Sequence, residues 1–191
     1  MSDAVEALLS GEVVVIPTDT VYGLACLPRF PAAVTRIFDL KGRTTGKSLP
    51  VLGHSAQAVA DLAVFDARAV ELARRFWPGS LTFVLPRAED FTYYLGEGSE
   101  TTIAVRVPQN DVALELLDAV GPLAVTSANI SGHPPADTAE EAEDVFGADV
   151  AAYVDGGPGR GVPSMVASLL EELEVLREGA VTREELVEAL S

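Results

Sequence analysis

Short apolar runs alternate with amphipathic segments from one end of the chain to the other. Consecutive apolar residues bounded by turn residues are typical of buried strands, and apolar residues three and four positions apart are typical of helices that cover a sheet. Strands are predicted over Glu12–Ile16, Leu49–Leu52, Ser80–Leu85, Thr102–Val107, Leu123–Thr126, Val150–Asp155, Met165–Leu170 and Leu173–Arg177. Helices are predicted over Ser2–Leu9, Pro31–Leu40, Ala56–Leu62, Ala67–Phe76 and residues 111–120.

The ends of several helices carry recognisable signals. Asn110 is an expected N-cap, and both Thr138-Ala-Glu-Glu141 and Thr182-Arg-Glu-Glu185 match the capping box. Several predicted strands follow one another with no helix between them, so the sheet should contain antiparallel as well as parallel pairs. We therefore expect one α/β domain over residues 1–191, with a mixed sheet and flanking helices.

Composition and charge restrict the class of protein. The chain has 191 residues, 48% of them hydrophobic, and 29 acidic against 13 basic side chains give a net charge of -16. No apolar run approaches the ~20 residues of a membrane span, and the first residues do not form a secretory signal. The single cysteine, Cys26, excludes an internal disulfide and a cysteine-based zinc site. These features predict a cytoplasmic protein without a membrane contact or a dedicated metal site.

The two lysines of the chain lie in one basic segment, Lys41-Gly-Arg43-Thr-Thr-Gly-Lys47-Ser. Three cations within seven residues of an acidic protein indicate a local site for a small anion such as phosphate or carboxylate. The segment is not a P-loop, because its two glycines are too close together and it follows a helix rather than a strand. A structural alternative is that Lys41 opposes the dipole at the end of the preceding helix, with Gly42 as its left-handed cap.

Other polar loops follow predicted strands or helices. Pro17–Leu24 holds three small hydrogen-bonding residues, which alone would indicate only a turn. Trp77-Pro-Gly-Ser80 is most simply a turn as well. Thr126–Gly132 follows a buried strand, and the glycine-rich loop that begins at Asp155 reads as a flexible loop beside a site.

Taken in order, these loops resemble those of a known family. The motifs are Pro17-Thr-Asp-Thr-Val-Tyr-Gly-Leu24, Lys41-x-Arg43, Pro78-Gly-Ser-Leu-Thr82, Ala104-Val-Arg-Val-Pro108 and Thr126-Ser-Ala-Asn129-Ile-Ser-Gly. They are similar to the YrdC-like family, which contains the threonylcarbamoyl-AMP synthases, and the resemblance runs from about Glu12 to Val181. The paired signature Lys-x-Arg with Ser-x-Asn is complete, as Lys41, Arg43, Ser127 and Asn129.

The resemblance implies a twisted sheet with a concave, basic site that joins L-threonine, bicarbonate and ATP into threonylcarbamoyl-AMP and pyrophosphate. It implies Mg²⁺ that arrives with ATP, and a downstream tRNA threonylcarbamoyl transferase. By motif position, the implied catalytic residues are Lys41, Arg43, Ser127 and Asn129. The implied ATP-binding residues are Arg43, Lys47, Thr102, Asn129 and Arg177, and the implied threonine-binding residues are Thr20, Arg106, Ser127 and Ser164.

The residue types suit this chemistry. A carbamate of threonine is already an anion, so its attack on phosphorus requires alignment and charge neutralisation rather than a strong base. Arg106 can hold a carboxylate with two parallel bonds, which a lysine cannot do. Two positions depart from the family pattern: Ser48 replaces a proline, and Met165 replaces a threonine whose hydroxyl is then lost.

Two other functions are weighed against the synthase. An RNA-binding accessory protein of the same fold would need many cationic contacts to phosphates, and 13 basic against 29 acidic residues predict only a weak contact with tRNA. A relative that uses carbamoyl-adenylate is the second alternative. Domains of that type usually lie within larger chains, so the complete four-residue signature favours threonine.

Overall fold

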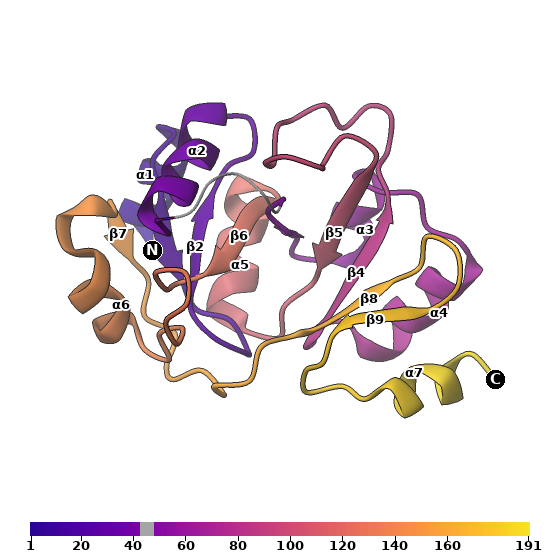
Figure 1. Cartoon of the computed structure of the whole chain (residues 1–191). Helices are drawn as coiled ribbons and strands as arrows, with labels where there is room; N and C mark the ends of the chain where they lie inside the picture. The colour runs from indigo at the N-terminus through magenta and orange to yellow at the C-terminus, as the bar shows by residue number, and fades with distance from the viewer. Residues whose placement is uncertain (43–47) are drawn as a thin grey trace.

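The computed structural model describes residues 1–42 and 48–191. Within them, one nine-stranded sheet has the order β7-β1-β2-β6-β3-β5-β4-β8-β9 (Figure 1). The strands are β1 Val14–Ile16, β2 Gly23–Cys26, β3 Val51–Leu52, β4 Leu81–Pro86, β5 Thr102–Arg106, β6 Leu123–Ser127, β7 Ala152–Tyr153, β8 Met165–Ser168 and β9 Glu174–Arg177. Three pairs are parallel, namely β1 with β7, β3 with β5 and β4 with β8, while the other neighbours are antiparallel. The predicted mixed sheet is confirmed.

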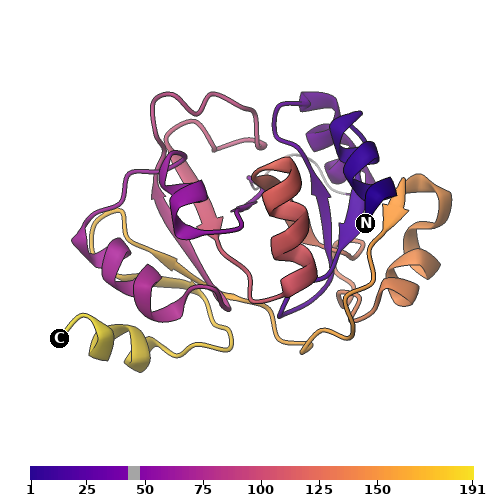
Figure 2. The ribbon, with the colours of Figure 1, turned by 180° about the vertical axis from the view of Figure 1, so that it is seen from behind.

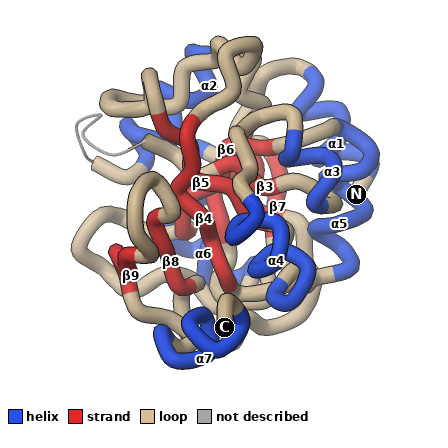
Figure 3. The backbone as a smooth tube through the Cα atoms, turned by 90° about the vertical axis from the view of Figure 1, so that its right-hand side faces the viewer, coloured by secondary structure: helices blue, strands red, loops and turns tan. Residues whose placement is uncertain are grey.

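Seven α-helices flank this sheet in the described ranges (Figure 3). They are α1 Ser2–Leu9, α2 Pro31–Leu40, α3 Ala56–Ala60, α4 Ala67–Phe76, α5 Asp111–Val120, α6 Ala139–Phe146 and α7 Arg183–Ala189, with a 3-10 turn at Gly147–Asp149. In none of them are length and hydrophobicity sufficient for a membrane crossing.

The predicted helix caps hold, with one correction. Asn110 accepts a hydrogen bond from the Ala113 amide at the start of α5. At α7 both halves of the capping box form between Thr182 and Glu185. At α6 only the first half forms as predicted. The Glu141 carboxylate reaches past Thr138 and accepts from the amide of Asp137 instead.

Two hydrophobic layers support the half of the sheet that contains β1, β2 and β6. Helices α1 and α5 cover one face, where Leu8 and Leu117 pack with Ile16. Figure 2 shows α5 in front of the central strands. Helices α2 and α6 cover the opposite face, where Ile37 packs in the cluster that contains Cys26. Burial raises the pKa of the Cys26 thiol to about 12, which suits the packing role expected for it.

Among residues 1–42 and 48–191, the other half of the sheet is covered on one face only. Buried Phe83 and Val105 pack in the same cluster as residues of α4 and α7. The alternate residues on the same strands, such as Val84, Ala104 and Val166, are only partly buried. One face of β5, β4, β8 and β9 is therefore open, and the polar residues of the candidate site lie along it.

Candidate active site

A row of side chains crosses the open face from Arg106 to Arg177. Thr82 pairs with Val166, and Val166 pairs with Arg177. Thr82 lies one position beyond the Phe83–Val105 pair, which places it opposite Arg106. Residues paired across a sheet point to the same side, so these side chains share one surface.

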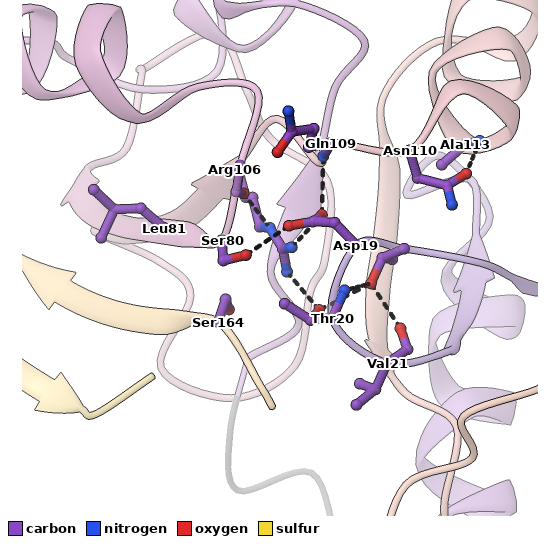
Figure 4. A network of polar contacts seen from close by, with 12 residues as sticks. Asp19, Thr20, Val21, Ser80, Leu81, Arg106, Gln109, Asn110, Ala113 and Ser164 are labelled. Atoms are coloured by element: carbon purple, nitrogen blue, oxygen red, sulfur yellow. Dashed lines mark hydrogen bonds and ion pairs between the residues drawn. The ribbon is translucent and has the colours of Figure 1, made fainter. Parts of the chain in front are cut away.

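Arg106 is the centre of a buried network at one end of this row (Figure 4). It is 5% exposed, and its guanidinium donates from three nitrogens: Nε to the Gly79 carbonyl at 2.9 Å, Nη1 to the Thr20 hydroxyl at 3.1 Å and Nη2 to the Asp19 carboxylate at 2.6 Å. Burial lowers the pKa of Arg106, and the Asp19 charge opposes that effect. The side chain therefore stays in one orientation and remains charged.

Asp19 is held as firmly as Arg106. One of its oxygens accepts from Arg106 and, at 2.9 Å, from the amide of Gln109. The other oxygen accepts from the Ser80 hydroxyl at 2.6 Å. Burial raises the pKa of Asp19, but the Arg106 cation and these two hydrogen bonds outweigh burial and lower it overall. Asp19 is thus an ionised carboxylate that compensates the charge of Arg106.

The turn that contains Gly79 and Ser80 positions two groups of this network. A Cβ on Gly79 would lie 2.3 Å from the Phe76 carbonyl oxygen, so only glycine allows the chain to pass this close to α4. The Gly79 amide also donates to the Val107 carbonyl at 2.8 Å. These contacts hold the turn against the end of β5, where its carbonyl and its serine reach Arg106 and Asp19.

Thr20 lies in the loop between β1 and β2, and its side chain and backbone have separate partners. Its hydroxyl is 2.9 Å from the Thr18 hydroxyl and accepts from Arg106. Its carbonyl accepts from the amides of Arg160 and Gly161, at 2.8 and 3.1 Å. The expected backbone turn is present, because the Thr18 hydroxyl donates to the Val21 carbonyl at 2.7 Å. The glycine-rich loop therefore packs directly against a predicted threonine-binding residue.

Ser164 and Arg177 lie together at the other end of the row. Arg177 donates from Nε and Nη2 to the Ser164 carbonyl at 3.0 and 2.8 Å, and from Nη2 to its hydroxyl at 3.1 Å. The Ser164 hydroxyl is also 2.9 Å from that of Thr82. In residues 1–42 and 48–191, no carboxylate forms an ion pair with Arg177. Burial lowers the pKa of Arg177, and its positive charge contributes to lowering that of Arg106.

Lys41, Ser127 and Asn129 form a second polar cluster. Lys41 is 2% exposed, and its Nζ donates to the Ser127 carbonyl at 2.7 Å, to the Asn129 side-chain oxygen at 2.9 Å and to the Asn129 carbonyl at 3.0 Å. The Ser127 hydroxyl donates to the same side-chain oxygen at 2.6 Å. Lys41 and Gly42 do end α2 as the structural alternative predicted, with φ +61° at Gly42. The Lys41 ammonium, however, bonds to the loop after β6.

The structure thus brings together most of the predicted site residues in two groups. Arg177, predicted on the ATP side, contacts Ser164, predicted on the threonine side. Thr102 lies on the same face of β5 as Arg106 but four residues away, about 13 Å along the strand. The predictions for Arg43 and Lys47 lie outside the described residues.

Sequence reasoning missed Asp19, Ser80 and Thr82 as site residues. All three lie inside quoted motifs, so the signal was present but their partners were not visible. Met165, which departs from the family pattern, lies away from the site because its side chain is fully buried on the core face of β8. The hydroxyl that is lost at this position would have pointed into the core.

Comparison with known proteins places this arrangement in a family. The family model Sua5_yciO_yrdC, described as "Telomere recombination", matches residues 6–179. The chain belongs to this family. The resemblance to YrdC-like proteins is therefore confirmed.

Relatives in the Sua5/YciO/YrdC family match almost the whole chain. A protein of Mycobacterium tuberculosis (strain H37Rv) is 40% identical over 193 residues, and the match covers 98% of this chain and 87% of the relative. The threonylcarbamoyl-AMP synthase of Bacillus subtilis (strain 168) is 37% identical, with 97% of this chain and 55% of the relative covered. The crystal structure of P. abyssi Sua5 complexed with L-threonine has a TM-score of 0.92 and 37% identity, over 98% of this chain and 56% of that one. This chain therefore spans little more than half of those two longer relatives.

Proposed function

We propose that this protein is an L-threonylcarbamoyladenylate synthase. It joins L-threonine, bicarbonate and ATP, and releases pyrophosphate and water. The observation that carries the proposal is the buried Arg106, held against Thr20 on an open sheet face, in a chain similar throughout to a Sua5 structure that contains L-threonine. We also propose that residues 1–191 act as one domain, since one sheet connects both groups of site residues.

The Arg106 end of the site binds threonine. Arg106 offers a planar cation to the α-carboxylate, and Thr20 and Ser164 supply hydroxyl groups within the same polar row. The partly buried Val84, Ala104 and Val166 provide apolar surface beside that row. Such a surface favours threonine over serine by ~1 kcal/mol or more, because serine lacks the methyl group.

The Lys41 cluster and Arg177 serve the nucleotide. Lys41 fixes the loop that presents Ser127 and Asn129. The Asn129 amide donates to the Ile130 and His133 carbonyls and the Ser127 hydroxyl donates to Asn129, so the Ser127 oxygen is the group suited to accept from a ribose hydroxyl. Arg177 contributes a cation without a carboxylate partner in the described part of the chain. Arg43 and Lys47 remain predicted phosphate ligands from the sequence alone.

The chemistry requires positioning more than proton transfer. Threonine and bicarbonate give a carbamate, and one carbamate oxygen attacks the α-phosphorus of ATP. The bond from that phosphorus to the oxygen of the leaving pyrophosphate breaks, so negative charge accumulates on the leaving group. Fixed cations near the phosphates lower the barrier by stabilising that charge.

Mg²⁺ would reach this site with ATP. The described residues contain no cluster of three or more His, Cys, Asp or Glu side chains that could hold a metal ion. Both oxygens of Asp19 already accept hydrogen bonds from protein groups. These observations fit an ion carried by the phosphates, where it would neutralise part of their charge.

The product is a mixed anhydride of a carbamate and a phosphate, which is reactive toward amines. A tRNA threonylcarbamoyl transferase is the proposed consumer. Contact with tRNA itself should be weak, because a net charge of -16 repels a polyanion.

The test is pyrophosphate release by the purified protein. We expect release from ATP only when L-threonine and bicarbonate are both present, with serine the poorer substrate. Release that needs carbamoyl phosphate and no threonine would assign the chain to the carbamoyl-transferring relatives. Tight, salt-sensitive binding of tRNA without any turnover would support the accessory RNA-binding function instead.

A further inference from the structure

Two arginines lie on the open face, and their charges are compensated differently. Arg106 forms an ion pair with Asp19 at 2.6 Å, and both side chains are almost completely buried. Arg177 bonds only to Ser164 and has no carboxylate partner in the described residues. The network at Arg106 therefore has a net charge near zero, whereas that at Arg177 has a net positive charge.

The donor groups of Arg106 can be counted. A guanidinium has five N–H groups. In the described part of the chain, Arg106 donates once from Nε, once from Nη1 and once from Nη2. One N–H on each terminal nitrogen is left for a ligand, and a carboxylate can accept two such bonds.

We propose that Asp19 determines the selectivity of the Arg106 subsite. It compensates the guanidinium charge, so that the fork accepts the carboxylate of zwitterionic threonine and does not retain phosphate. This inference rests on the proposed function and assigns a positioning residue to its threonine subsite.

Such selectivity is needed because the site must admit two kinds of anion at once. A phosphate group carries more negative charge than a carboxylate, so an uncompensated Arg106 would attract the phosphates of ATP or the pyrophosphate product. A nearby fixed carboxylate repels phosphate, and it affects a zwitterion of zero net charge much less. Repulsion of the wrong ligand thus leaves Arg106 available for the amino acid.

Ser80 keeps Asp19 in this role. Its hydroxyl occupies the oxygen of Asp19 that does not face Arg106, at 2.6 Å, and the Gln109 amide occupies the oxygen that does. With both oxygens bonded, Asp19 cannot rotate away from the guanidinium. The glycine at position 79 fixes the turn from which Ser80 projects.

The first test is the Asp19→Asn variant. An asparagine keeps the shape, can still accept from Arg106 and Gln109, and can donate to the Ser80 oxygen, so it removes mainly the charge. The measurements are the Kd of L-threonine by calorimetry and the inhibition constant of inorganic phosphate as a competitor of threonine in the pyrophosphate-release assay. We expect the ratio of the phosphate constant to the threonine constant to fall by about tenfold or more, because one unit charge within a few ångströms of phosphate has been removed.

Two controls separate charge from general damage. Ser80→Ala loosens Asp19 without changing its charge, so threonine should bind more weakly while the ratio stays within about twofold of the wild-type value. Asp66→Asn removes the carboxylate of a different ion pair, in which Asp66 at the start of α4 lies 2.7 Å from Arg68. It should leave both constants unchanged.

A second set of variants covers the case in which Asp19→Asn does not fold. Arg106→Gln leaves Asp19 as an uncompensated anion, and the double variant Asp19→Asn, Arg106→Gln is neutral and close in shape to the native pair. Phosphate should bind about tenfold more tightly to the double variant than to Arg106→Gln. Equal phosphate binding by these two proteins would overturn the proposal.

The outcomes separate this inference from the proposed function. A wild-type protein that neither binds threonine nor depends on it for turnover overturns the synthase proposal, and this inference with it. A wild-type protein that depends on threonine, combined with an Asp19→Asn ratio equal to that of the wild type, overturns only the role of Asp19. If Ser80→Ala lowers the ratio as strongly as Asp19→Asn does, the proposed role of Asp19 is also overturned, because loss of charge would not be the cause.

Discussion

Lys41 provides the sharpest test of how the nucleotide side of the site is built. Its ammonium is buried and donates, at 3.0 Å or less, to two backbone carbonyls and one side-chain oxygen in the segment Ser127–Asn129, with the Ser127 hydroxyl oxygen at 3.5 Å. Lys41→Met keeps a long side chain but removes the charge and every donor. The loop after β6 then loses the group that joins it to the end of α2.

The magnitude follows from these contacts. Each hydrogen bond from a charged donor contributes roughly 1.5–3 kcal/mol, but part of the loss of three such bonds is recovered when the carbonyls bind water and the lysine no longer has to be buried. We therefore expect the free energy of unfolding to fall by roughly 2–4 kcal/mol. For a protein of this size that corresponds to a decrease in Tm of roughly 5–15 °C.

Activity should fall as well, by about tenfold or more in kcat/KM, because Ser127 and Asn129 lose their fixed positions. Pyrophosphate release measured well below Tm gives this value, and urea unfolding gives the stability. The helix-dipole interpretation predicts a different result, a loss of only ~0.3–1 kcal/mol in stability with unchanged activity.

A matched control exists beside β8, near one edge of the sheet. Arg68 also donates to two backbone carbonyls far away in sequence, those of Glu171 at 2.6 Å and Leu169 at 3.0 Å. Arg68→Met should lower stability and leave turnover per folded molecule unchanged. If Lys41→Met instead melts and reacts like the wild type, the buried lysine neither stabilises the loop after β6 nor contributes to the site.

Three further predictions concern charge. Arg106→Lys should weaken threonine binding by about tenfold or more and leave ATP binding unchanged in calorimetry, since one ammonium cannot replace a planar guanidinium. A loss of affinity confined to ATP would reverse the assignment of the threonine and ATP sides of the site. Raising NaCl from about 0.05 to 1 M should raise the urea midpoint, because salt screens the self-repulsion of a chain with a net charge of -16, and a midpoint that does not change would contradict this. The pKa of Asp19 in the folded protein is below its ordinary value, so the stability that Asp19 contributes is complete above the unfolded pKa of about 3.9 and is lost as pH falls through the folded pKa. Urea unfolding between about pH 6 and 3 should therefore show a decrease in the free energy of unfolding at the acid end, and this decrease should be smaller in Asp19→Asn.

The periodic segments of this chain were predictable because their signals are local. The helix Pro31–Leu40 has a proline in its first turn and buries Val34, Ile37 and Phe38 on one face, as its spacing indicates. Strand ends were less predictable: the strand expected over Val150–Asp155 is reduced to Ala152–Tyr153. Hydrogen bonding to a neighbour decides where a strand ends, and the neighbour of β7 is β1, more than a hundred residues earlier.

The site shows the same division between local and distant signals. The resemblance to the family assigned Thr20, Arg106 and Ser164 by their positions in motifs, whereas the polar loops alone would have indicated only turns. The pairing of Asp19 with Ser80 and Arg106 did not stand out, since these residues are 61 and 87 positions apart in the chain. The sequence likewise placed Lys41 correctly at a helix end, but its partners in the loop after β6 emerge only from the tertiary structure.

The single thiol of the chain has a practical consequence. Cys26 is fully buried in β2, and burial raises its pKa to about 12, so a water-soluble thiol reagent can reach and modify it only when the sheet opens. The rate of that modification therefore reports opening of the core in the unaltered protein. Because the native thiol is unreactive while the protein is folded, a cysteine introduced at the surface can carry a fluorophore or spin label selectively, without prior removal of Cys26.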